Sequence, residues 1–141
     1  MNNHWHTNYR AEQDGPTTFR YSIQPHAKFR SDEATRFGTS LTQPLIAVAA
    51  QGVEAYTTPR LFIDAPGVTV SAFKPSDDGK AVIVRLFGAS GKAGRASVKW
   101  FAPAPPKVFL SDNSERAGAP AGNTIDVPAY GIMTLRAELP K

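Results

Sequence analysis

Short apolar or alternating runs, separated by turn-forming residues, recur along the second half of the chain, and this spacing most restricts the fold. The separators include Asp77-Asp78-Gly79, the loop from Ser90 to Gly94 and the stiff connector from Pro103 to Pro106. Short strands with turn residues at regular intervals are typical of an all-β sandwich. The sequence therefore predicts a mainly β protein, an antiparallel β-sandwich. Its strands are expected at Ile46 to Ala50, Arg60 to Ile63, Val68 to Phe73, Ala81 to Phe87, Ala96 to Phe101, Lys107 to Leu110, Thr124 to Val127 and Ile132 to Leu139.

A further strand is predicted before these, at Thr17 to Gln24. Phe19, Tyr21 and Ile23 alternate there with polar residues, which is the period of a half-buried strand. The turn that precedes it is expected at Gly15-Pro16, because glycine permits unusual backbone angles and proline fixes the next one.

One short helix is predicted near residues 31–42. Ser31 is suited to be its N-cap, and Asp32 and Glu33 follow in the first turn, where the helix dipole favours carboxylates. Apolar residues fall at helical spacing on one side, and Pro44 forces an end. The apolar residues of that side are Ala34, Phe37 and Leu41.

Composition indicates one domain. With 141 residues, 41% of them hydrophobic, the chain suffices for a single core, so residues 1–141 are assigned to one β-sandwich domain with an extended segment at 1–16. The absence of cysteine excludes disulfides. No apolar run is long enough to span a membrane. The net charge of +4 comes from scattered basic residues, which argues against nucleic-acid binding.

The first nine residues are the strongest candidate for a binding site. They combine amides, imidazoles and aromatic rings with no strand or helix period. Sugars offer hydroxyls to amide and guanidinium groups and C–H faces to an indole ring, so this mixture suits carbohydrate contact. The candidate sugar-binding residues are Asn2, Asn3, Trp5, Thr7, Asn8 and Arg20. The alternative is structural: Trp5 packs, Asn8 forms a turn and Arg20 is a solvated strand residue.

Metal binding and independent catalysis are both disfavoured by the sequence. Zinc needs three or four convergent ligands, and the only histidines are His4, His6 and His26. Glycoside hydrolysis needs two carboxyl groups across a sugar-sized cleft, whereas the acidic residues here fall in turns, connectors and a helix start. No catalytic residue and no metal ligand is therefore assigned.

The order of several segments carries a family resemblance. These are the opening Asn-Asn-x-Trp-x-Thr-Asn, the Phe-Arg-Tyr of residues 19–21, the turn from Lys74 to Lys80, Leu110-Ser111-Asp112, and the closing strand that follows Val127. Together they resemble the C-terminal β-sandwich region of glycoside hydrolase family 38 α-mannosidases.

The resemblance implies that the chemistry resides elsewhere. Enzymes of this family use a carboxylate nucleophile and a zinc ion, both held by an N-terminal catalytic domain that these residues do not contain. Their His-x-His-x-Asp zinc pattern is echoed at His4-Trp5-His6-Thr7-Asn8, but Asn8 replaces the carboxylate, so no zinc site is carried over.

The leading functional hypothesis is therefore a non-catalytic domain of an α-mannosidase-like hydrolase, a fragment that braces the catalytic domain and contributes to its sugar site. The expected partners are that domain and an α-mannoside, and the exposed domain interface is expected to permit self-association. Two alternatives stay open: a freestanding carbohydrate-binding module and a purely structural interaction domain.

Overall fold

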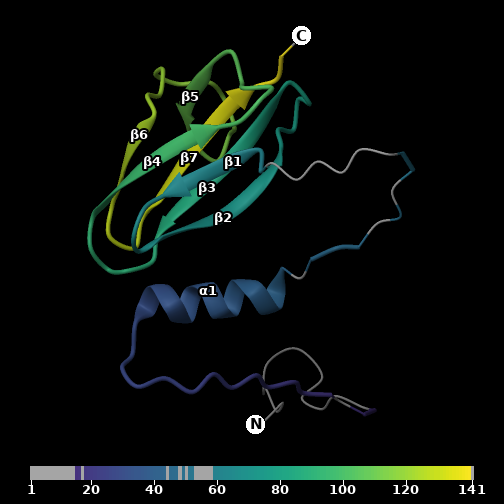
Figure 1. Cartoon of the computed structure of the whole chain (residues 1–141), viewed down its shortest axis with the longest axis vertical. Coiled ribbons are helices and arrows are strands. Elements are labelled where there is room, and N and C mark those ends of the chain that lie inside the picture. The colour runs from purple at the N-terminus through teal and green to yellow at the C-terminus, as the bar shows by residue number, and fades with distance from the viewer. Residues whose placement is uncertain are drawn as a thin grey trace, which may run out of the picture.

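The computed structural model describes residues 15–16, 18–43, 45–47, 49, 51–52 and 59–140. These residues form one helix followed by seven strands (Figure 1). The helix is α1 (Ser31–Thr42), and the strands are β1 (Leu61–Asp64), β2 (Val68–Pro75), β3 (Ala81–Gly88), β4 (Gly94–Trp100), β5 (Val108–Ser111), β6 (Thr124–Val127) and β7 (Ile132–Glu138).

The strands form two antiparallel sheets that face each other. One has the order β1-β4-β6 and the other β2-β3-β7-β5. In the larger sheet β3 and β7 are central, and their register places Val84 opposite Leu135. A bulge interrupts β2 between Val70 and Ala72, which bends this edge strand. The prediction of a mainly β sandwich with one short helix is confirmed.

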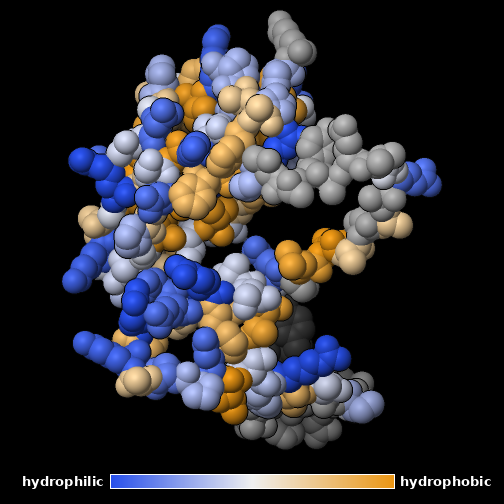
Figure 2. Space-filling view, in the orientation of Figure 1, coloured by the Kyte–Doolittle hydropathy of each residue, from blue (hydrophilic) through white to orange (hydrophobic). Residues whose placement is uncertain are grey.

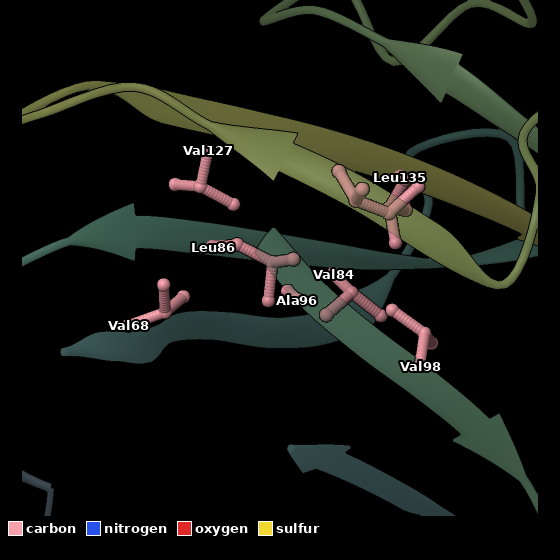
Figure 3. Close-up of a cluster of buried hydrophobic side chains, with 8 residues drawn as sticks. Val68, Val84, Leu86, Ala96, Val98, Val127 and Leu135 are labelled. Carbon is pink, nitrogen blue, oxygen red and sulfur yellow. The ribbon is translucent and has the colours of Figure 1, made fainter. Parts of the chain in front are cut away.

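The hydrophobic core lies between the sheets and follows from the period of two along each strand. Alternate residues of a strand point to opposite faces, so each sheet turns one set of branched side chains inward (Figure 3). Both sheets contribute to the buried cluster, which consists of Val68, Val84, Leu86, Ala96, Val98, Ile125, Val127 and Leu135. Full burial of a Val or Leu side chain contributes about 1.5–3 kcal/mol, so this cluster dominates the stability of the sandwich.

The connector between β5 and β6 protects the edge of the larger sheet. The N–H groups of Gly118 and Ala121 donate to the carbonyls of Leu110 and Val108, each at 2.9 Å, and the N–H of Leu110 donates to Ala119 O at 2.8 Å. These hydrogen bonds satisfy an edge that would otherwise be open to a further strand.

Helix α1 covers the predicted residues 31–42, but Ser31 is not its N-cap. The N-cap is Arg30, with extended backbone angles, and Ser31 is already helical. The Arg30 guanidinium lies 2.9 Å from the Asp32 carboxylate and 3.2 Å from that of Glu33, so both acids of the first turn are paired with it. The helix ends at Thr42, in agreement with the predicted stop before Pro44.

Two predicted strands are wrong in the residues that the structure describes. Residues 18–24 form no strand and are all exposed, and residues 46, 47 and 49 of the predicted strand Ile46 to Ala50 have no regular structure either. The seven other predicted strands are confirmed, with bounds that differ by at most two residues. Alternation creates a face to bury, but a strand needs a second strand to pair with.

Candidate functional site

Most of the predicted sugar-contact residues lie outside the described part of the chain. These are Asn2, Asn3, Trp5, Thr7 and Asn8, so their assignment stays a prediction. Arg20 is described and is exposed in the irregular segment 18–24. His26 is exposed as well, and its ring meets that of Phe29 edge to face at 6.1 Å between centroids. Within the described residues, no group of three or more His, Cys, Asp and Glu side chains could hold a metal ion.

The structure reveals instead a charged cluster on the outer face of the larger sheet, made of Lys74, Asp78, Arg85, Glu115 and Arg136. Glu115 lies at its centre and is only 5% exposed, with a positive φ of 59°. Its carboxylate lies 2.6 Å from Lys74 Nζ and 3.6 Å from Arg85 Nη2. The same carboxylate accepts a hydrogen bond from the N–H of Asp77 at 2.9 Å. Glu115 thus joins the connector after β5 to strands β2 and β3.

Arg136 of β7 links the two halves of the cluster. Its guanidinium donates to the carbonyl of Glu115 at 2.8 Å and to Asp78 Oδ2 at 2.7 Å. Asp78 Oδ1 in turn accepts hydrogen bonds from Ser76 Oγ at 2.6 Å and from the N–H of Lys80 at 3.0 Å. The β2–β3 turn is therefore fastened to both β7 and the connector.

These contacts favour the charged forms of Asp78 and Lys74. Hydrogen bonding from Arg136, and then from Ser76 and the Lys80 N–H, holds the pKa of Asp78 well below its ordinary value. Hydrogen bonds to Glu115 and Asp77 raise the pKa of the Lys74 ammonium. Within the described residues, Arg85 Nε is buried without a hydrogen-bond partner, although Nη2 of the same side chain approaches Glu115.

A carboxyl group with a lowered pKa, such as that of Asp78, is unsuited to glycosidic acid catalysis. A hollow of about 410 Å³ beside the cluster is lined by the acids Asp77, Asp78, Glu115 and Glu138 together with Arg116 and Arg136. A glycosidase needs one carboxyl group whose pKa is raised so that it can donate a proton, and the shift of Asp78 is in the opposite direction. The cluster fastens three segments together. Sequence reasoning missed it because Asp78 and Arg136 lie 58 positions apart.

Comparison with known families fits this picture of a structural sandwich. Residues 67–135 match the model of the glycosyl hydrolases family 38 C-terminal beta sandwich domain. These residues belong to that family. The match runs from just before β2 into β7 and includes every residue of the charged cluster except Arg136, which follows the last matched residue. A search of curated proteins finds no match to the chain.

The sandwich has an apolar cleft at one end. The cleft measures about 340 Å³ and is lined chiefly by apolar side chains, among them Phe73, Trp100 and Leu139. Polar groups lie at its rim: Glu138, and Arg60, whose guanidinium donates to Ala102 O at 3.4 Å. Trp100 is half-buried and also packs against the core.

Most of the large apolar side chains in the described part of residues 18–47 are exposed. Figure 2 shows hydrophobic side chains on the surface of this region and on the sandwich. The exposed ones are Phe19, Tyr21, Ile23, Phe29, Leu41, Leu45 and Ile46. Helix α1 is too short and too polar to cross a membrane, and it is the only helix among the described residues.

A groove of about 450 Å³ separates α1 from the sandwich. The helix lines it with the polar residues Arg36, Thr39, Ser40 and Gln43, and β1 and β2 line it with Ile63, Val68 and Val70 among others. The helix therefore turns a polar side toward the sandwich. Of its apolar side, Ala34 and Leu41 are exposed and Phe37 is half-buried.

Proposed function

We propose that the chain is a non-catalytic domain of an α-mannosidase-like family 38 glycoside hydrolase, and that it braces the catalytic domain of that enzyme. The observation that carries this proposal is the family 38 match over the sandwich. It is supported by the charged cluster, where the buried Glu115 is ion-paired and Asp78 has a lowered pKa. On this proposal the catalytic domain supplies the nucleophile and the zinc ion.

Rigidity is the property that suits the sandwich to this role. A brace must hold its partner in a fixed geometry, since a displacement of about 1 Å at a catalytic site costs on the order of a hundredfold in rate. The buried core and the charged cluster both resist deformation of the sandwich. Asn2, Asn3, Trp5, Thr7, Asn8 and Arg20 would then contribute sugar contacts at the domain junction.

Co-expression with the family 38 catalytic domain encoded in the same genome tests the proposal. We expect the two to co-purify as one complex, and the complex to hydrolyse p-nitrophenyl α-mannoside faster than the catalytic domain alone. The chain alone should be inactive. Hydrolysis by the chain alone, or the absence of a complex together with unchanged activity, would overturn the proposal.

A carbohydrate-binding module is the second candidate, favoured by the Trp100 cleft. A half-buried indole beside Arg60 and Glu138 offers a stacking surface with polar groups at its rim. Titration calorimetry of the chain with mannobiose tests this function, with Trp100→Ala as the matched variant. Heat of binding that Trp100→Ala abolishes would support a sugar site, and no heat from the wild-type chain would exclude it.

A further inference from the structure

Residues 18–24 have the pattern of a strand but not its surroundings. In an extended chain Phe19, Tyr21 and Ile23 share one face, and Thr18, Arg20, Ser22 and Gln24 share the other. The three apolar side chains are 52%, 72% and 88% exposed, respectively. A face of this kind on a single segment is unusual in a monomer and marks an interaction surface.

The larger sheet of the sandwich does not need this segment as a further strand. Its core is closed without this segment, since Val84, Leu86 and Leu135 are fully buried. The β5 edge is hydrogen-bonded by the connector, and the β2 edge faces the groove beneath α1. The family 38 match begins at residue 67, so residues 18–24 lie outside it.

The apolar surface continues beyond the segment. Phe29 is 66% exposed and, together with Ala34 and Phe37 of α1, lines a hollow of about 500 Å³ beside residues 24–30. A partner that pairs with residues 18–24 would therefore also meet this hollow, which has both apolar and charged side chains in its lining.

The charge of residues 18–43 indicates which kind of partner residues 18–24 bind. Residues 18–43 carry four basic side chains, Arg20, Lys28, Arg30 and Arg36, against the two acids Asp32 and Glu33. A second copy would bring the same positive excess to the interface, and like charges disfavour such pairing. The family 38 match implies a different occupant, the catalytic domain of the same enzyme.

We propose that residues 18–24 add as a β-strand to a sheet edge of that catalytic domain, burying Phe19, Tyr21 and Ile23 against it. This inference rests on the proposed function and identifies the surface through which the brace attaches. Backbone hydrogen bonds of an added strand supply affinity, and the alternate side chains supply specificity.

Paired substitutions on the two faces of the segment test the proposal. The double variant Tyr21→Lys with Ile23→Lys places two charges on the apolar face, and the control Ser22→Lys with Gln24→Lys places the same charges on the polar face. Biolayer interferometry with the co-expressed catalytic domain should show affinity reduced on the order of tenfold or more for the first variant and by less than about threefold for the control. Thermal unfolding of both variants should match wild type, because the core lies elsewhere.

Hydrogen exchange supplies an independent measurement on the unmodified chain. The amides of residues 18–24 should exchange rapidly in the free chain and become protected in the complex. Binding that is equal for both double variants, without protection of these amides, would overturn the strand proposal and leave the bracing role standing. Failure of the wild-type chain to bind would instead overturn the bracing role. Concentration-dependent protection in the chain alone would identify a second copy as the occupant and contradict the proposal.

Discussion

The sandwich and the region before it have similar local sequence patterns but different surroundings. In the sandwich, Val84, Leu86 and Leu135 are completely buried. In residues 18–47, alternation at Phe19, Tyr21 and Ile23 is just as regular, yet Ile23 is 88% exposed. The difference teaches that period two specifies which residues will share a face. Whether that face is buried depends on strands from elsewhere.

The physical source of the difference is long-range pairing. Strand β3 lies between β2 and β7, so its hydrogen bonds are satisfied on both sides and its inward side chains meet the opposite sheet. Residues 18–24 are part of neither sheet among the described strands. Backbone ordering costs about 1–2 kcal/mol per residue, which isolated alternation does not offset.

Truncation of a core leucine should cause the largest loss of stability. It tests most directly whether the sandwich core is buried while residues 18–24 are exposed. Leu135→Ala should lower the free energy of unfolding by about 2–5 kcal/mol, because it removes buried contacts and leaves a cavity. Ile23→Ala, at an exposed position, should change it by less than about 0.5 kcal/mol. Urea unfolding followed by circular dichroism measures both. A comparable loss in the two variants would show that residue 23 is buried in solution.

Neutralisation of the central acid of the charged cluster should have the next largest effect. Glu115→Gln should cost about 1–3 kcal/mol, since it weakens contacts to Lys74 and Arg85 at a buried position. Asp126→Asn, at an exposed ion pair with Arg95, is the matched control and should change stability by less than about 0.5 kcal/mol. Urea unfolding measures both variants. If Glu115→Gln is as stable as Asp126→Asn, the charged cluster does not stabilise the fold.

Acid should destabilise the sandwich through Asp78. The pKa of this carboxyl is lower in the folded chain than its ordinary value of 3.8, so its contribution is present above about pH 4 and is lost as the pH falls further. The thermal midpoint should therefore drop between pH 4 and pH 2. In Asp78→Asn the midpoint should depend less steeply on pH over this range. A residual slope should remain, because hydrogen bonds from Ser114 also lower the pKa of Asp112. An unchanged slope in Asp78→Asn would contradict the assignment.

The smallest change in stability is expected from a substitution in α1. A Cβ at Gly38 would meet no atom within 4 Å, so Gly38→Ala should stabilise the helix by about 0.5–1 kcal/mol through helix propensity alone. Far-UV circular dichroism should show greater helicity. Trp100 fluorescence, in a Trp5→Phe background, should show an unchanged sandwich midpoint. A parallel rise in that midpoint would show that α1 and the sandwich unfold as one unit.

Local pattern was sufficient for much of the fold. Alternation and turn residues predicted seven strands, and Asp32, Glu33 and Pro44 bracketed the helix to within a residue. The charged cluster could not be predicted, because Glu115 sits in a connector and its partners Lys74 and Arg85 belong to separate strands. The N-cap was predicted wrongly as Ser31, since the cap is Arg30, which makes two ion pairs with the first turn and no side-chain capping hydrogen bond.

The sequence by itself determined the fold class, the positions of the strands from β1 to β7, and the resemblance to family 38, because each depends on spacing along the chain. Only the tertiary structure decided which alternating segments are buried. It also brought Asp78 and the backbone of Glu115, which lie in different loops, to the guanidinium of Arg136. Both outcomes depend on contacts between residues far apart in sequence. A period of two specifies which side chains share a face but not what lies against it.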